Sequence, residues 1–287
     1  MASSSVSKSF FQTRSISFPS RSHSKTNQFE QQLYTLRSSQ AASTSSSSVS
    51  HRLNSLKYLY DNADELLQLP SNQLLLSKYK HTKSIEEVLN GSLRLLEICG
   101  TSRDVLQQSK EQLQEIQSVL RRRSSGEFSI ANEVIEYLNT RKKAKKTIKK
   151  CLRDIKEAHK NGETNAIVTM LKDTEAITID TFKSFLSYIA GAKLQSQKSS
   201  WSTVSKLINQ SGNKEAAAAV SEFDIVDDTL DLLIQRKKTG INMSQVENMK
   251  SQMIKLESEI QDFDEALECL FRHLVRTRAT LLNILSN

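Results

Sequence analysis

Apolar residues recur every three or four positions along most of the chain, which is the spacing of amphipathic helices. One such stripe begins at Leu53 and should end at Leu69, because Pro70 disfavours helical geometry in the residue before it. The β-branched run "AITIDTF" at 176–182 lowers the helix propensity of the segment that contains it. No stretch alternates apolar and polar residues for long enough to predict a sheet. Further stripes predict helices near residues 129–160, 164–190, 201–210 and 214–238.

Two capping boxes predict the starts of the longest helices. "SIEE" at 84–87 opens one that passes a candidate break at Gly100, and "SQVE" at 244–247 opens one of about 40 residues. Apolar columns flank the seam of this last helix, so its face is wider than that of a two-stranded coiled coil. We therefore expect it to pack inside the chain against the helices at 85–120 and 129–160, although a seam shared between two chains stays open. The seam comprises Val246, Met249, Met253, Leu256, Ile260, Phe263, Leu267, Leu270, Leu274, Thr277, Leu281 and Ile284.

The first 50 residues have a different pattern. Residues 1–26 contain ten serines and little apolar periodicity, so they cannot bury enough surface to offset the entropy of ordering. Residues 27–50 contain a short helix and a Ser-rich linker that should tether this helix to a helical bundle domain over 51–287. The predicted fold is all-α, an elongated antiparallel bundle of long helices with a disordered Ser-rich N-terminal tail. The apolar face of the short helix is formed by Phe29, Leu33 and Leu36.

The net charge of +8 changes this picture only locally. Residues 1–50 are basic, residues 141–150 carry seven basic and no acidic side chains, and the rest of the chain is slightly acidic. The sequence therefore predicts no specific nucleic-acid surface. No apolar run is long enough to span a membrane, and we expect a cytoplasmic protein. The three cysteines are widely spaced and predict neither a disulfide framework nor a zinc site: Cys99, Cys151 and Cys269.

No pattern typical of catalysis occurs in the sequence. The five histidines fall in different segments, and the seven glycines stand singly rather than in a phosphate-binding loop. The carboxylates of "ESEIQDFDEALE" lie at helical spacing beside an apolar seam, which favours a solvated helix face over a metal site. We expect a non-enzymatic protein without a metal or a cofactor.

The segment "RKKAKKTIKK" at 141–150 is the first candidate site. Arg141 and Lys145 occupy two positions of the apolar stripe, so we expect one or two turns of this helix to bury little. One interpretation is a charged turn of a bundle helix whose long side chains lie over apolar surface. The other is a binding site for an anionic membrane surface, calmodulin or a nuclear-import receptor. The candidate basic patch comprises Arg141, Lys142, Lys143, Lys145, Lys146, Lys149 and Lys150.

Two serine-containing motifs are candidates for phosphorylation. "RSISFP" has the form Arg-Ser-x-Ser-x-Pro, in which Arg14 would direct a kinase to Ser17 and Pro19 would turn the chain out of the groove of a 14-3-3 protein. A cleaved plastid transit peptide is the competing interpretation of residues 1–26, and it would place the protein in the chloroplast. The second motif is "RRRSSG", whose basic residues suit a kinase or simply end a helix, with candidate phosphosites Ser124 and Ser125.

Four segments, in this order, resemble a plant family of unknown biochemical function related to the BYPASS protein: "RSISFPSRSH", "LLQLPSNQLLLS", "SLRLLEICGTSRDVLQQSKEQLQEIQSVLRRR" and "YLNTRKKAKKTIKKCLRDIK". The resemblance extends from about Phe10 to the end, with Ser24 standing where the family's motif leads us to expect proline. It implies a role in root and shoot development through control of a mobile root-derived signal, and it supplies no catalytic or ligand-binding residues.

Two hypotheses about function follow from these observations. The first is a non-enzymatic helical adaptor or regulator of plant development, which docks protein partners through its regulated tail. The second is a peripheral membrane or trafficking factor, in which the basic helix at 141–150 meets anionic lipid and the C-terminal helix pairs with a partner coiled coil. The sequence leaves the partner and the oligomeric state open.

Overall fold

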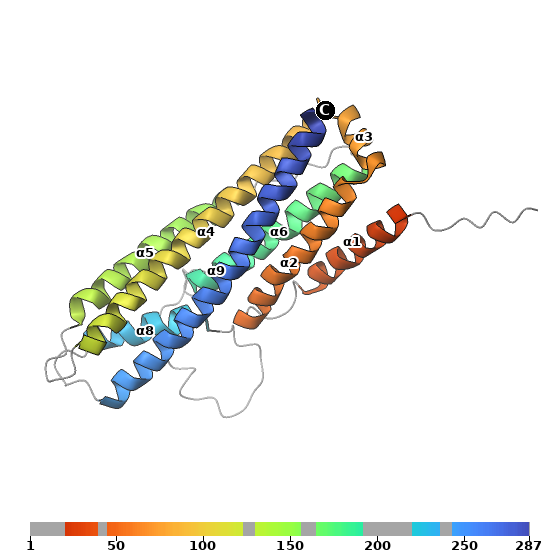
Figure 1. The fold of residues 1–287 in the computed structure, drawn as a ribbon. Coiled ribbons are helices and arrows are strands. Elements are labelled where there is room, and N and C mark those ends of the chain that lie inside the picture. The colour runs from red at the N-terminus through yellow and green to blue at the C-terminus, as the bar shows by residue number, and fades with distance from the viewer. Residues whose placement is uncertain are drawn as a thin grey trace, which may run out of the picture.

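The computed structural model describes residues 21–39, 45–122, 130–155, 165–191, 220–235 and 243–286. Within these ranges the chain is helical and contains no strand, which confirms the predicted all-α class (Figure 1). The helices are α1 (Arg21–Ser38), α2 (Ser46–Leu67), α3 (Pro70–Lys78), α4 (Lys83–Arg122), α5 (Ala131–Asp154), α6 (Ala166–Ala190), α8 (Glu222–Gln235) and α9 (Met243–Ser286).

Successive long helices reverse direction and form an elongated bundle. Figure 1 shows α4 lying between α5 and α9, with α2 between α9 and α1. Hydrogen bonds fix these directions. The Arg278 guanidinium near the end of α9 donates to the Leu89 carbonyl near the start of α4, so these two helices are antiparallel. Helices α2 and α9 run parallel, because Ser46 bonds to Glu259 at one end and Asp64 to Thr277 at the other.

Helix α6 is the buried centre of the bundle and packs against α1 through α5. The helix predicted near 164–190 is therefore confirmed, including the β-branched run at 176–182. The threonine hydroxyls that would oppose a helix are satisfied inside it, since Thr174 and Thr178 donate to carbonyls four residues earlier. The β-branched side chains of Ile177, Thr178, Ile179 and Thr181 are buried, which stabilises the helix through tertiary contacts rather than through propensity.

The seam of α9 is buried inside the chain along its whole length, as the sequence predicts. Its neighbours are α2 and α4, with α8 and α3 at its two ends. The expectation that the helix at 129–160 also covers this seam is wrong, because the buried face of α5 packs on α4, α6 and α8. Of the flanking columns, Val275 and Leu282 are exposed, whereas Phe271 and Leu285 pack partly against the core.

The N-terminal boundaries differ from the prediction. Helix α1 begins at Arg21 rather than after residue 26, and it packs its predicted apolar face on α2 and α6. It is part of the bundle rather than a tethered element, because Leu33 and Leu36 are almost completely buried. The Ser-rich linker predicted at 38–50 is wrong in its second part, because α2 already begins at Ser46. The remainder of the predicted tail, residues 40–44 of that linker and the helix at 201–210 lie outside the described residues.

The predicted ends of the other helices are close but not identical to those in the structure. Both capping boxes are displaced, since α4 begins at Lys83 and α9 at Met243, each one residue before the predicted cap. Helix α4 continues without a break through Gly100. Helix α2 ends two residues before Leu69, and Pro70 then opens α3, where its missing N–H leaves no helical hydrogen bond unmade.

Candidate functional site

The residues singled out from the sequence divide into two groups. The docking motif Arg14, Ser17 and Pro19 and the candidate phosphosites Ser124 and Ser125 lie outside the described residues. All seven members of the predicted basic patch lie on α5, where the structure separates them onto two faces.

Arg141 faces inward and is only 2% exposed. Its Nε donates to Asp227 Oδ1 on α8 at 3.0 Å, and its Nη2 donates to the carbonyl oxygen of Ile189 at the end of α6 at 2.8 Å. The guanidinium also stacks over the ring of Phe223, with the central carbon 4.7 Å from the ring centroid. The expectation of a turn that buries little is wrong here, because the buried Arg141 guanidinium meets the Asp227 carboxylate and the Ile189 carbonyl oxygen.

Asp227 is the centre of this inner cluster. Its carboxylate accepts hydrogen bonds from Arg141, from the Tyr137 hydroxyl at 3.0 Å and from Lys145 Nζ at 2.9 Å. Burial by itself would raise the pKa of Asp227, but the charges and hydrogen bonds of Arg141 and Lys145 outweigh burial and hold the pKa below its usual value. The same burial raises the pKa of Tyr137 well above its usual value, and the Asp227 charge adds to this. The carboxylate is thus ionised and the phenol neutral.

The turn after α6 fits closely against this cluster. Gly191 has φ +80° and ψ 163°, a conformation that is almost restricted to glycine. A Cβ added there would collide with the carboxylate of Asp224, which lies 3.8 Å from Lys145 Nζ. The inner cluster, defined as Tyr137, Arg141, Lys145, Asp224 and Asp227, therefore joins α5 and α8 beside the end of α6.

The partners of Arg141 were missed in the sequence, but a signal for them exists. On α8 the apolar residues Phe223, Val226 and Leu230 define the buried face, and Asp227 lies on that same face. Arg141 likewise lies on the buried face of α5. Opposite charges on the apolar faces of two helices predict a buried ion pair, because a lone charge at such a position would be strongly destabilising.

The other five lysines of the predicted patch face outward. Lys142, Lys143, Lys146, Lys149 and Lys150 are exposed, and among the described residues none of them forms an ion pair. Arg153, one turn after Lys149, is also exposed and extends the series. We call these six residues the outer basic face.

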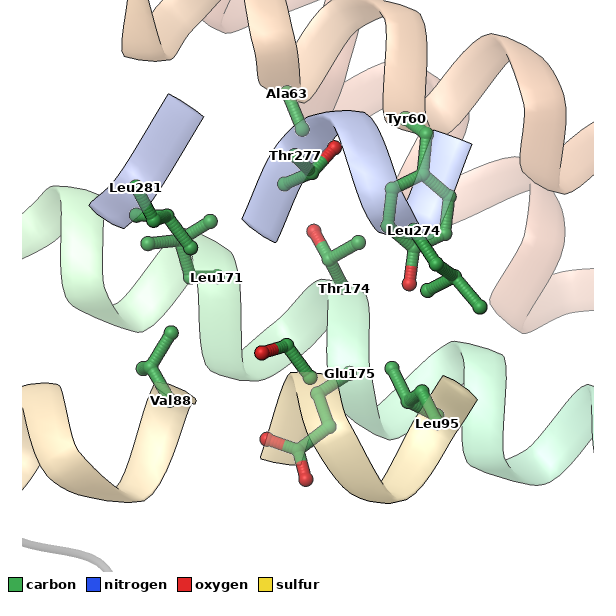
Figure 2. Close-up of a pocket in the computed structure, with 11 residues that line it drawn as sticks. Tyr60, Ala63, Val88, Leu95, Leu171, Thr174, Glu175, Leu274, Thr277 and Leu281 are labelled. Carbon is green, nitrogen blue, oxygen red and sulfur yellow. The ribbon is translucent and has the colours of Figure 1, made fainter. Parts of the chain in front are cut away.

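A second polar group lies in the middle of the bundle, around a small cavity of about 30 Å³ between α2, α4, α6 and α9. Figure 2 shows Thr174 pointing toward Thr277 across the cavity and Tyr60 beside Leu274, with leucine and valine side chains around them. A volume of this size holds about one or two water molecules. It is too small for a metabolite or an organic cofactor.

Glu175 turns away from this cavity toward α4 (Figure 2). Its Oε1 accepts a hydrogen bond from Arg94 Nη2 at 2.7 Å, and the carboxylate lies so close to Gly91 that a Cβ at that position would collide with it. Glycine is needed here for the close approach of the carboxylate to the α4 backbone. The charge of Glu175 is thus matched by a residue of the adjacent helix.

Glu259 on α9 is another buried carboxylate, and its pKa is shifted in the opposite direction to that of Asp227. Its Oε1 accepts a hydrogen bond from Ser46 Oγ at 2.6 Å, and Tyr188 is its other hydrogen-bonding neighbour. Burial raises the pKa of Glu259, and the hydrogen bonds from Ser46 and Tyr188 offset this only in part. No cation contributes there, in contrast to Asp227.

Among the residues that the structure describes, no three His, Cys, Asp or Glu side chains gather in a way that could hold a metal ion. None of the described helices is both long enough and apolar enough to cross a bilayer. The thiol of Cys99 is buried, which raises its pKa to about 12 and leaves it unreactive as a nucleophile.

A family model described as Protein BPS1 matches residues 52–284, which is most of the chain and nearly all of the helical bundle. No curated protein and no solved structure matches the chain.

Proposed function

Because the chain belongs to the BYPASS-related family of Protein BPS1, we propose that it acts in plant development as a non-enzymatic helical adaptor. The observation that most supports this proposal is that three buried carboxylates are each paired with an arginine of another helix. Asp227 is bonded to Arg141, Glu175 to Arg94 and Asp64 to Arg276. The small central cavity has room only for water. Recognition is then a property of the outer surface and of the N-terminal segment.

The N-terminal segment supplies the docking motif of this proposal. Phosphate on Ser17 would add about −1.5 to −2 charges and form charge-assisted hydrogen bonds with an arginine cluster on a 14-3-3 protein. Pro19 stands two residues before Arg21, where α1 begins, and α1 is packed on the bundle. A partner bound at Ser17 would therefore be held close to the bundle rather than at the end of a long tether.

A peptide experiment tests the motif. A peptide spanning Phe11 to Ser22 should bind a plant 14-3-3 protein only when Ser17 is phosphorylated, and more weakly after Pro19→Ala. Equal binding of the unphosphorylated peptide would refute the docking motif. A mature protein in plant tissue that begins after Pro19 would refute it as well, and would support the plastid alternative. Ser124 and Ser125, between α4 and α5, are the second pair of candidate phosphosites.

Affinity purification from plant tissue tests the adaptor itself. The full chain should retain protein partners that are lost when residues 1–20 are removed, a deletion that ends before α1 and so leaves the bundle complete. Ser17→Ala in the full chain tests the phosphorylated serine alone, since this substitution removes one hydroxyl and changes no helix. Turnover of a metabolite by the purified chain in an unbiased screen would contradict a non-enzymatic role.

A further inference from the structure

We infer that the outer basic face of α5 is a docking surface for an anionic lipid bilayer. This goes beyond the adaptor proposal and does not depend on it, because it rests on the separation of the cations of α5 by the fold. The face consists of Lys142, Lys143, Lys146, Lys149, Lys150 and Arg153.

The six cations form one continuous stripe. With about 100° between successive residues of a helix, all six fall within an arc of about 120°. They extend over about 17 Å along the axis, since each residue of a helix rises about 1.5 Å. Helix α5 lies at the edge of the bundle, with α4 on one side in Figure 1, so the stripe can approach a flat surface.

The stripe is not paired with acidic side chains in the described part of the chain. No ion pair involves any of the six cations, whereas Lys145 on the adjacent inner face binds Asp227. The acidic residues of α5 lie at its two ends, where Glu133 and Glu136 precede the stripe and Asp154 follows it. Like charges at i,i+4, such as Lys142 with Lys146, are mildly destabilising to a helix. The folded protein thus keeps a repulsive arrangement that an external anionic surface would relieve.

The composition of the stripe favours a bilayer over other polyanions. Five of its six cations are lysines, which act as point charges. Only one is an arginine, whose planar guanidinium can form paired hydrogen bonds with a phosphate or a base edge. No large apolar or aromatic side chain is exposed between residues 142 and 153, so no platform for base stacking is present. Contact with the charged plane of lipid headgroups needs neither feature.

The groove beside the stripe gives no reason to expect a preferred headgroup. This groove, of about 240 Å³, lies between α4 and α5, and its lining has both signs of charge, with Arg94 and Lys150 as well as Glu97 and Asp154. A site that selected one phosphorylated headgroup would need convergent cations. Binding should therefore follow the surface charge density of the bilayer and should weaken with salt, because the contacts are exposed.

Vesicle flotation of the full chain tests this inference. The protein should float with vesicles that contain phosphatidylserine, remain unbound with phosphatidylcholine alone, and dissociate as salt rises from low to physiological concentration. Vesicles matched in surface charge with phosphatidylserine or with a phosphatidylinositol monophosphate should bind equally. A clear preference for one of the two at equal charge would overturn the non-selective surface that we infer.

Charge reversal locates the binding. The triple variant Lys142→Glu, Lys146→Glu, Lys149→Glu should bind at least about a hundredfold more weakly, since each cation near an anionic surface contributes about fivefold to the binding constant. Its matched control reverses three exposed lysines on and after α3, with the same change in net charge, and should bind as the unaltered chain does. The control substitutions are Lys78→Glu, Lys80→Glu and Lys83→Glu.

Three outcomes would overturn the inference. They are no binding of the unaltered chain to anionic vesicles at low salt, binding to neutral vesicles of equal strength, and equal loss in the control and test variants. A polyglutamate chain is included as a competitor. If the protein binds polyglutamate through the outer basic face but does not bind vesicles, the face recognises an acidic protein instead of a bilayer. Circular dichroism of both triple variants confirms that each is folded.

Discussion

The two faces of α5 carry the same kind of charge and put it to opposite uses. On the inner face, Arg141 and Lys145 meet Asp227 within hydrogen-bonding distance and join α5 to α8. On the outer face, six cations point to solvent with no anion among the described residues. The inner cations are one turn or less from the outer ones in sequence. Position on the helix, rather than local charge density, therefore decides whether a basic residue stabilises the fold or is available to a partner.

The largest predicted effect comes from breaking the inner cluster. Arg141→Met leaves the Asp227 carboxylate buried without its main counter-charge, and such a change costs about 3–5 kcal/mol in free energy of unfolding. Urea unfolding monitored by circular dichroism measures this loss, with Lys142→Met as the outward-facing control. The double variant Arg141→Met, Asp227→Leu should recover much of the stability because it removes both charges. A loss below about 1 kcal/mol in the single variant would show that the pair does not hold α8.

The next largest effect distinguishes two glycines, one directly after α6 and one within α4. Gly191→Ala forces a non-glycine residue into a conformation that costs about 1–3 kcal/mol, and its Cβ also collides with Asp224 of the inner cluster. Gly100→Ala is the matched control, because no atom lies within 4 Å of the added Cβ and α4 is helical there. This control should be stabilised by about 0.5–1 kcal/mol through helix propensity. Equal midpoints of thermal unfolding for the two variants would contradict the close fit at Gly191.

The pH dependence of stability should have opposite signs at Asp227 and Glu259. The folded-state pKa of Asp227 is lowered, so its contribution is present above the unfolded-state pKa of about 4 and is lost as pH falls through the folded value. The loss caused by Asp227→Asn should therefore shrink in acid. The pKa of Glu259 is raised, so ionisation opposes folding as pH rises, and Glu259→Gln should compare more favourably with the unaltered chain at pH 7 than at pH 4. Urea titrations at both pH values measure these differences.

The inner cluster also shows which parts of the structure the sequence could predict. The seam of α9 is predictable because its twelve positions follow one another in regular alternating steps of three and four residues. Each of them is buried. Two stripes of residues at helical spacing pass through Arg141. One contains Leu138 and Lys145, the other contains Tyr137 and Ala144, and the sequence does not show which of the two faces the core. The structure buries the second stripe. The choice depends on α8, whose Asp227 is 86 residues away in sequence.

Tertiary contact also explains how α6 and α1 are stabilised. Helix α6 contains a β-branched run that local propensity disfavours, but its packing against α1 through α5 compensates, and contacts of this kind cannot be read from the segment alone. Helix α1 has only three buried apolar side chains at helical spacing, too few to show that it packs on the bundle. Their receiving surface is built from α2 and α6, which come later in the chain. Of the candidate sites, only the outward position of the five lysines follows from periodicity.

The smallest effect concerns the outer face and has the opposite sign to the first. Lys146 has Lys142 and Lys150 at i−4 and i+4, and Lys143 and Lys149 at i−3 and i+3. Lys146→Glu converts these four like-charge neighbours into opposite-charge neighbours, each contributing a few tenths of a kcal/mol in an exposed helix. The variant should be more stable by about 0.5–1 kcal/mol at low salt, with the gain reduced at high salt by screening. Lys146→Gln, which only removes the repulsion, should gain about half as much.

Urea unfolding at the two salt concentrations measures both gains in stability. A destabilised Lys146→Glu would mean that Lys146 packs against the bundle rather than facing solvent. If the gain is found together with weaker vesicle binding, then the outer face is maintained at the expense of stability, which is the reverse of what Arg141 does one turn away.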